Sequence, residues 1–253
     1  MKFSHTLCSL GFAALVFFLP VVARSQSDTS TAPRAQSEPK TREPILTKGD
    51  AAILGVGVAA TAYLFSVDKQ ISDQFRDPQS QRNPTLRSIS DFGNYAGDPG
   101  TVVVGAGIWL SGHLTHDRTR ELVGRRTLEA LAAAATATFV LKMVTGRARP
   151  DESPDEPMDF RLGRGFGNRN EFQSFPAGHV SQIFAFASAI DAELNRIAPD
   201  HPKWLVPLLY AVATTGGASR FYRDRHWTSD VVFGATIGFV AGRAVVRWRG
   251  DSK

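Results

Sequence analysis

The chain has 253 residues, 43% of them hydrophobic, so one sizeable domain can bury a core once non-folding segments are set aside. Its formal net charge of +5 favours an anionic partner, whether nucleic acid, a phospholipid surface or a phosphorylated substrate, without choosing among them. The single cysteine, Cys8, lies in an N-terminal apolar segment. A chain processed there has no thiol, which excludes disulfides, cysteine nucleophiles and zinc–thiolate sites.

The N-terminal segment, residues 1–23, has the pattern of a secretory signal, because Lys2 precedes an apolar run that ends at small residues. We expect cleavage after Ala23 or Ser25. The alternative is an anchor helix that is not cleaved. Either outcome predicts export to the cell envelope, on the periplasmic side.

A linker follows the signal. Residues 24–48 are rich in Ser, Thr, Pro, Gln and charge, and they cannot bury enough apolar surface to offset the entropy of ordering. We therefore predict a disordered linker over 24–48, a helical domain over 49–247 and a polar tail over 248–253.

Six long apolar stretches make up the domain. They are rich in Ala and Leu and lack strict alternation, so they predict helices rather than strands. The expected fold is all-α, a six-helix bundle. The predicted helices cover approximately 51–67, 100–114, 127–144, 178–195, 203–219 and 229–247.

Whether these helices cross a membrane depends on their length and their polar residues, because a span needs about 20 mostly apolar residues. The polar residues within the stretches are Glu129, Gln182, Asp191, Glu193 and Arg243. Such side chains are costly where they face lipid, whereas burial inside a bundle suits them. Six complete spans would also return the later loops to the cytoplasm. We expect a bundle that is partly embedded in the membrane or lies on it.

Two segments at the junction of the third and fourth helices indicate an anion site. In "LKMVTGRARP", Lys142 and Arg149 close the third helix, although a lysine reaching to water beside solvated arginines would give the same pattern. In "SFPAGHV", Gly178 lets the backbone approach a ligand, and the free N–H groups of a helix start bind anions. His179 stands at this start, where a capping histidine without chemistry is the alternative.

The segment "SRFYRDRHWTSD" adds a second histidine. Ser219 and Arg220 end the fifth helix, His226 follows, and Asp230 comes four residues later. On a helix that carboxylate would lie beneath the imidazole, accept the Nδ1 proton and leave the Nε2 lone pair outward. In an up-and-down bundle these helix ends lie together, so the three segments predict one pocket.

The motifs K-x6-R-P, P-[SA]-G-H and S-R-x5-H-x3-D resemble those of the type 2 phosphatidic acid phosphatase and vanadium haloperoxidase superfamily, over about residues 48–247. The resemblance implies a helical bundle and a metal-independent phosphatase of phosphate or diphosphate monoesters. It further implies a phosphate site in which cations clamp the oxygens and a hydroxyl and a backbone N–H add hydrogen bonds. The implied phosphate-binding residues are Lys142, Arg149, Arg220, Ser219 and Gly178.

The same resemblance assigns the catalytic roles. His226 would attack phosphorus to form a phosphohistidine, Asp230 would orient it, and His179 would protonate the leaving oxygen. The two histidines must then hold opposite protonation states, His226 neutral and His179 charged, which predicts a bell-shaped pH profile. One position departs from the family pattern, since Ala177 stands where serine is usual. We expect slower turnover without loss of activity.

The expected substrate is a lipid phosphate, with small phosphomonoesters as the alternative. No cofactor is expected, vanadate should bind as an inhibitor, and no nucleic-acid module is present. Two other functions stay open at this point, a vanadate-dependent haloperoxidase and a non-catalytic envelope protein that binds phospholipid headgroups.

Three further segments have weaker signals. Residues 113–117, "HLTHD", lack a third clear metal ligand, and the acidic run at 151–159 lacks a calcium-loop pattern. Both predict solvated segments. Arg161, Arg164 and Arg169 either guide a phosphate headgroup inward or form a solvated basic loop.

Overall fold

The computed structural model describes residues 44–97, 99–167 and 169–250. The predicted signal peptide, most of the predicted linker and residues 251–253 lie outside this range. The helices are α2 (Lys48–Phe65), α3 (Asp68–Arg76), α4 (Pro78–Arg82), α5 (Pro84–Ala96), α6 (Gly100–Thr115), α7 (Arg118–Thr145), α8 (Gly178–Ile197), α9 (Leu205–Tyr222) and α10 (Thr228–Gly250), with short 3₁₀ turns at Arg164–Phe166 and Asn170–Phe172.

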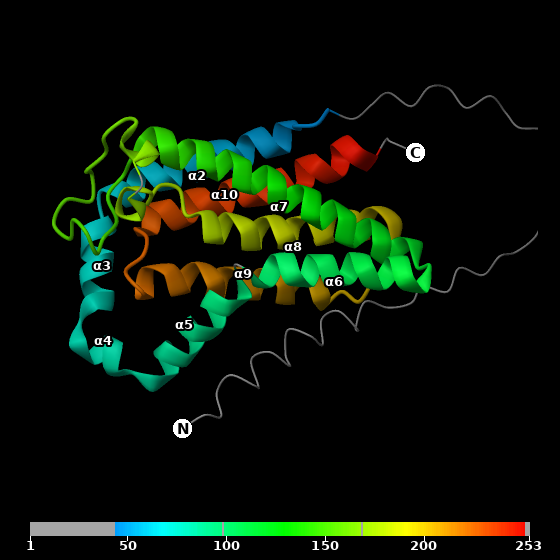
Figure 1. Cartoon of the computed structure of the whole chain (residues 1–253), viewed down its shortest axis with the longest axis horizontal. Helices are drawn as coiled ribbons and strands as arrows, with labels where there is room; N and C mark the ends of the chain where they lie inside the picture. Colours follow the sequence, from blue (N-terminus) through cyan, green and yellow to red (C-terminus); the bar gives the residue numbers. More distant parts are fainter. Residues whose placement is uncertain (1–43, 98, 168, 251–253) are drawn as a thin grey trace, which may run out of the picture.

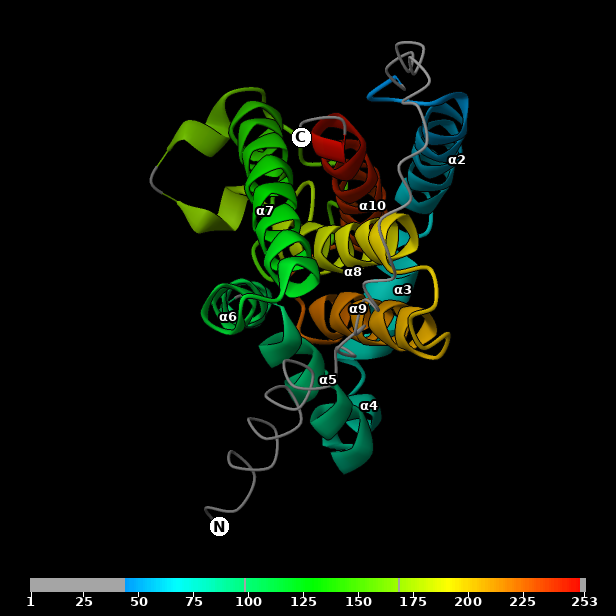
Figure 2. The ribbon, with the colours of Figure 1, turned by 90° about the vertical axis from the view of Figure 1, so that its right-hand side faces the viewer.

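The predicted all-α bundle is confirmed. Each of the six apolar stretches forms one long helix, α2, α6, α7, α8, α9 or α10, and these helices run side by side along the long axis of the molecule (Figure 1). Helix α8 is central, since it packs against α7, α9 and α10 (Figure 2). Its alanines at 185, 187 and 189 are almost fully buried, which lets all three neighbours approach it.

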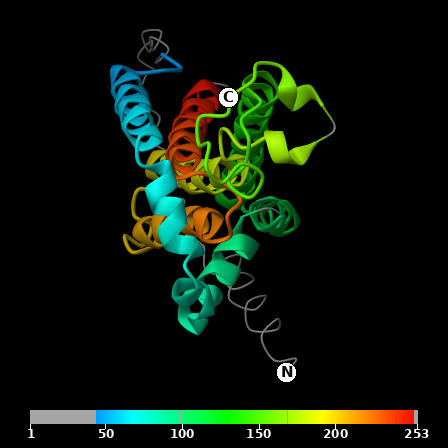
Figure 3. The same cartoon turned by 90° about the vertical axis from the view of Figure 1, so that its left-hand side faces the viewer.

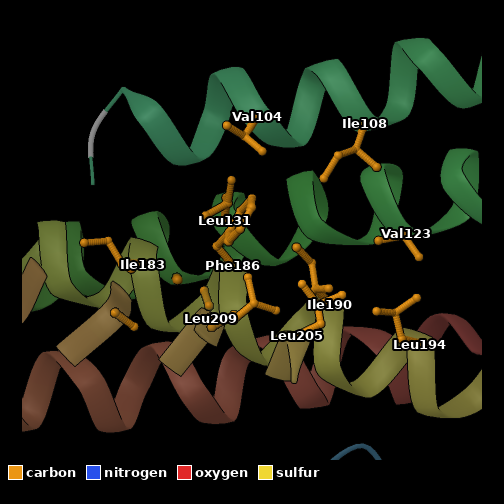
Figure 4. Close-up of a cluster of buried hydrophobic side chains, with 14 of the residues drawn as sticks. Val104, Ile108, Val123, Leu131, Ile183, Phe186, Ile190, Leu194, Leu205 and Leu209 are labelled. Atoms are coloured by element: carbon orange, nitrogen blue, oxygen red, sulfur yellow. The ribbon is translucent and has the colours of Figure 1, made fainter. Parts of the chain in front are cut away.

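The main core lies where α6, α7, α8 and α9 face one another (Figure 4). Ile183, Phe186 and Ile190 project from α8 toward Leu131 of α7 and Leu209 of α9. Each of these side chains is nearly inaccessible to solvent. Burial of one such side chain contributes about 1.5–3 kcal/mol, so this cluster fixes the relative positions of the four helices.

Glycines bring α10 unusually close to α8. A Cβ built on Gly238 would lie 2.2 Å from the carbonyl oxygen of Ser181, and one on Gly234 would lie 2.5 Å from that of Ala177. Neither distance is tolerable for a side chain, so glycine is required at both positions. This close approach holds the start of α10 against the start of α8, where the predicted pocket lies.

A polar arm of three short helices connects α2 to α6, and the sequence analysis did not assign it. Helices α4 and α5 begin with Asp77–Pro78 and Asn83–Pro84, in which the side chain of Asp77 or Asn83 caps the first turn and proline takes the first helical position. Helix α5 packs against α9. The arm lies at the same end of the bundle as the connection between α7 and α8 (Figure 3).

The outer surface of the bundle carries many apolar side chains. Helices α2, α7 and α10 are long and apolar enough to cross a membrane, by length and composition. Large apolar side chains point outward from several helices and are more than half exposed. They include Val56, Tyr63, Val103, Leu114 and Phe139. Such a surface suits lipid better than water.

Three of the polar residues named from the sequence lie on the central helix α8 and have partners inside the bundle. Glu193 is fully buried and pairs with Arg196 at 2.6 Å. Asp191 accepts a hydrogen bond from the Tyr210 hydroxyl at 3.1 Å, and Gln182 donates to a backbone carbonyl of α7 at 3.0 Å. On the candidate spans themselves, Glu129 of α7 pairs with Arg126 at 3.1 Å, and Arg243 of α10 lies 3.6 Å from Asp50. The polar residues named from the sequence therefore have partners within the bundle.

Candidate active site

The helix ends that carry the three motifs meet at one end of the bundle. Lys142 Nζ, at the end of α7, lies 3.4 Å from the carbonyl oxygen of Ser174. The same carbonyl lies 2.8 Å from His226 Nδ1, just before α10. Arg149 Nη1 donates to the carbonyl of Arg225 at 3.2 Å. Residues distant in sequence therefore line one site, as the sequence analysis predicts.

The contacts of His226 fix its tautomer. A carbonyl oxygen can only accept, so the neutral imidazole donates its Nδ1 proton to Ser174 and keeps the Nε2 lone pair. Burial lowers the pKa of His226 well below its usual value. Its ring is therefore neutral near pH 7, and Nε2 has the electronic form that a nucleophile needs.

Asp230 lies close to this ring but is not the principal acceptor of the Nδ1 proton. Its Oδ2 is 3.6 Å from His226 Nδ1, beyond hydrogen-bond distance, so the structure replaces the predicted Asp230 hydrogen bond with one to the Ser174 carbonyl. Oδ2 instead accepts from Ser174 Oγ at 2.5 Å and from the Trp227 backbone N–H at 3.0 Å. Asp230 thus supplies negative charge beneath the imidazole and also caps the start of α10.

Arg147 holds Asp230 in place, and sequence reasoning missed it. Its guanidinium is fully buried, donating to Asp230 Oδ1 at 2.5 Å and to Asp68 Oδ2 at 2.8 Å. It also lies within 5.0 Å of the ring centres of Phe65 and Phe160. A buried guanidinium needs such partners to offset desolvation. The only available signal was its place between Lys142 and Arg149, because Asp68 is far away in sequence.

Two of the three predicted clamp cations are held by the connection between α7 and α8. Lys142 Nζ donates to the carbonyls of Gln173 and Ser174, and an ammonium has a third hydrogen to offer. Arg149 donates to the backbone and side-chain oxygens of Asn170 at 2.9 and 2.8 Å. Asn170, which sequence reasoning did not single out, therefore orients the Arg149 fork.

The third cation, Arg220, is supported from the polar arm. Its Nη1 donates to Asn94 Oδ1 of α5 at 2.7 Å. Its Nε is buried and has no hydrogen-bond partner among the residues that the structure describes. Arg220 lies close enough to Arg149 for their charges to repel. A buried donor without a partner, between repelling cations, is the arrangement expected of an anion site.

Ser219 and the start of α8 complete the predicted phosphate site. The Ser219 hydroxyl donates to the Gly216 carbonyl at 2.7 Å, so it must turn before it can donate to a phosphate. Gly178 opens α8, its neighbour Ala177 provides no side-chain cap, and a Cβ on Gly178 would lie 3.4 Å from Lys142 Cε. The α8 start therefore offers backbone N–H groups beside Lys142. The Ala177 methyl is buried in an apolar cluster.

His179 lies beside the polar arm. Its Nε2 is 3.4 Å from the Gly93 carbonyl, and a Cβ on Gly97 would lie 1.9 Å from the same atom. Burial, and then the charge of Arg220, lower the pKa of His179 to about 4. His179 is therefore neutral near pH 7 while the pocket holds no anion, in contrast to the charged state expected from sequence.

The candidate metal-binding segments and the arginines at 161, 164 and 169 lie outside the phosphate site. Within the described ranges, no group of three or more His, Cys, Asp or Glu side chains gathers as a metal site. In the acidic run, Asp151 pairs with Arg225, and Asp159 pairs with both Arg161 and Arg164. Arg169 pairs with acidic neighbours as well. Of the three arginines, Arg164 is half-buried and donates to the Gly146 carbonyl, so it helps to hold the connection between α7 and α8, whereas the side chains of Arg161 and Arg169 are largely exposed.

Comparison with known families agrees with the three motifs. The sequence model of the PAP2 superfamily matches residues 125–253, which contain every predicted site residue. The chain belongs to the PAP2 superfamily. Helix α2 and the polar arm, which supplies Asp68 and Asn94, precede the matched region.

Individual PAP2 relatives match over shorter stretches. The chain is 38% identical over 69 residues to a lipid A 1-phosphatase of Porphyromonas gingivalis, and 34% identical over 99 residues to one of Rhizobium johnstonii. These matches cover 27% and 39% of this chain and only 15% and 36% of the relatives.

The fold resembles that of a solved PAP2 structure. A transmembrane PAP2-type phosphatidylglycerolphosphate phosphatase from Bacillus subtilis superposes with a TM-score of 0.57 at 21% identity. The match covers 82% of this chain and 98% of that one. At this identity the likeness establishes the arrangement of the helices.

Proposed function

We propose that the protein is a lipid phosphate phosphatase that works through a phosphohistidine on His226. The observation that carries the proposal is the state of His226. Its Nδ1 proton is held by the Ser174 carbonyl, and its Nε2 lone pair is unprotonated near neutral pH. A nucleophile of this kind beside Lys142, Arg149 and Arg220 fits attack on a phosphoryl group, whose developing charge is spread over its oxygens.

The reaction would proceed in two balanced steps. His226 Nε2 forms a bond to phosphorus while the bond to the ester oxygen breaks, and His179 gives its proton to the departing alkoxide. A water molecule then attacks the phosphohistidine, gives a proton to His179 and releases phosphate, which regenerates His226. The three cations stabilise the oxygens in both transition states, so the proposed reaction requires no metal.

The substrate would bring the proton that His179 needs. A phosphate anion beside His179 favours the charged imidazole and opposes the effects of burial and Arg220. His179 and the phosphoryl group would therefore share one proton in the complex. Vanadate, which has similar charge and geometry, should occupy the same place as an inhibitor.

Two findings favour a lipid substrate on an exported domain. The bundle exposes apolar side chains around its long helices, and the relatives that match this chain are named as phosphatases of lipid A. A phosphorylated headgroup at the membrane surface would reach the pocket while its acyl chains stay among the apolar helices. The signal-like residues 1–23 support a site on the periplasmic side.

Phosphate release in the presence of a chelator tests the function. We expect the full chain in detergent to release phosphate from phosphatidic acid, an isoprenyl diphosphate or both, faster than from soluble esters. His226→Ala should abolish release. His113→Ala is a matched control, because His113 is exposed and lies in α6. Equal rates for wild type and His226→Ala would overturn the proposal, and bromide oxidation that needs vanadate and peroxide would favour a haloperoxidase.

A further inference from the structure

A cavity of about 250 Å³ opens beside the candidate active site, between the polar arm and the end of α9. It takes no part in the mechanism described above. The residues that line it are Gln81, Arg87, Ser90, Asp91, Tyr222 and Arg223.

The cavity is joined to the active site through two helices. Along α5, the neighbours Ser90 and Asp91 lie three and four residues after Arg87 and four and three before Asn94, so the four residues share one face. Asn94 is the residue that holds Arg220. With a rise of 1.5 Å per residue, Arg87 lies roughly 10 Å along the helix from Asn94.

Most polar groups of the cavity are already paired, with one exception. Arg223 donates to Ser90 Oγ at 3.1 Å and pairs with Asp91, which offsets the charge of both. The Tyr222 hydroxyl lies 3.5 Å from the Gln81 carbonyl. Arg87 is exposed, and its guanidinium has no ion pair or hydrogen bond within the part of the chain that the structure describes.

The net charge of the lining is therefore positive. Formal charges of +2 from Arg87 and Arg223 and −1 from Asp91 sum to +1. Since Ser90 accepts from Arg223, its hydroxyl hydrogen remains able to donate. A guanidinium and a hydroxyl for which the described residues offer no acceptor suit an anionic group of a ligand.

Helix α5 also carries exposed apolar side chains beside its polar face. Ile89 and Tyr95 are 47% and 53% exposed. Helix α5 thus presents a polar face to the cavity and apolar side chains to its surroundings. This arrangement suits a substrate whose headgroup lies in the cavity and whose acyl chains remain outside.

We propose that this cavity binds a second anionic group of the substrate, separate from the phosphoryl group that is hydrolysed. The preferred substrates are then lipids that carry two anionic groups on one headgroup. Arg87 is the principal ligand of the distant group. The inference rests on the proposed phosphatase function and adds a choice among its substrates.

Paired synthetic substrates test this inference. Long-chain alkyl phosphates are compared with the same molecules carrying a phosphonate, which is not hydrolysed, at a series of distances from the phosphate. For the full chain in detergent we expect a favourable distance at which the phosphonate lowers KM about five-fold and leaves kcat unchanged. Arg87→Gln should remove this advantage. Arg82→Gln, an exposed arginine of α4 that does not line the cavity, should retain it.

The outcomes separate the two proposals. Two results would overturn the second site and leave the phosphatase in place. The first is phosphate release with the same KM whether or not the substrate carries a phosphonate. The second is an equal loss of the lowered KM in Arg82→Gln and Arg87→Gln. A separate methylphosphonate that produces the same effect would show that the anion need not belong to the substrate, which also overturns the inference. No release from any compound would overturn the function and the inference with it.

Discussion

At the scale of single residues, the chemistry depends on how the ring of His226 is held. The Ser174 carbonyl takes the Nδ1 proton, and Asp230 contributes charge from 3.6 Å away. In a triad whose aspartate alone sets the tautomer, replacing it with asparagine costs about 10⁴-fold in rate. Here the backbone carbonyl is the nearer acceptor of the Nδ1 proton, so the tautomer depends less on the carboxylate.

Asp230→Asn should therefore be a mild substitution. We expect kcat to fall by roughly 10- to 100-fold, which corresponds to one charge-assisted contact, while KM changes little. Arg147 keeps its partner Asp68, so the fold should survive. Steady-state kinetics with a melting curve as control will check this. A loss as complete as that of His226→Ala in a folded protein would contradict the assignment of the tautomer to Ser174.

Arg147 stabilises the site by pairing two buried carboxylates. Arg147→Met should lower the free energy of unfolding by about 3–5 kcal/mol, because Asp68 and Asp230 would then be buried without a cation. The triple variant Arg147→Met, Asp68→Asn, Asp230→Asn should recover most of this stability and remain slow in catalysis. Denaturant unfolding in detergent measures the stability of the single and the triple variant. If the triple variant is as unstable as the single one, Arg147 acts through packing instead.

The histidine pKa values set the pH dependence of kcat/KM. His226 is neutral until the pH falls to its lowered pKa, well below 6.5. The fall of kcat/KM on the acid side of the profile is therefore shifted to lower pH. His179, with a pKa of about 4, carries no proton in the free enzyme at neutral pH, so the proton enters with the phosphate monoanion. The second pKa of a phosphate ester is about 6, so kcat/KM should fall above that pH. A rate that rises from pH 5 to 9 would contradict two-histidine catalysis.

At the scale of helices, the close contact between α10 and α8 positions the site. Gly238→Ala should be destabilising by about 1–3 kcal/mol and should slow turnover, because the new methyl would meet the Ser181 carbonyl. Gly55→Ala is the matched control, since nothing lies within 4 Å of its added Cβ. Melting temperature and kcat of the two variants check this. Equal stability of both variants would show that the close contact is not required.

The sequence predicts long apolar helices well and short polar ones poorly. The six bundle helices were predicted to within a few residues at most ends, although α7 starts nine residues before its predicted range. Helices α3, α4 and α5 were missed because they have no long apolar stretch. Their signals were the pairs Asp77–Pro78 and Asn83–Pro84, which mark helix starts.

At the scale of the whole molecule, the fold brings residues from six helices, α3, α5, α7, α8, α9 and α10, and from two connections to one end of the bundle. Motif spacing was enough to single out His226, Asp230, His179 and the three cations as candidate site residues. Their partners were not predictable. Asp68 and Asn94 come from the polar arm, and no local pattern relates either residue to the position that it contacts.

The most direct test of the account is to trap the covalent intermediate. The full chain is mixed with a ³²P-labelled lipid phosphate, quenched in base because phosphoramidates are labile in acid, and digested for peptide mapping. The account predicts label on the peptide that contains His226, and none in His226→Ala. Turnover by the wild type without any protein-bound label, or label that persists in His226→Ala, would contradict it.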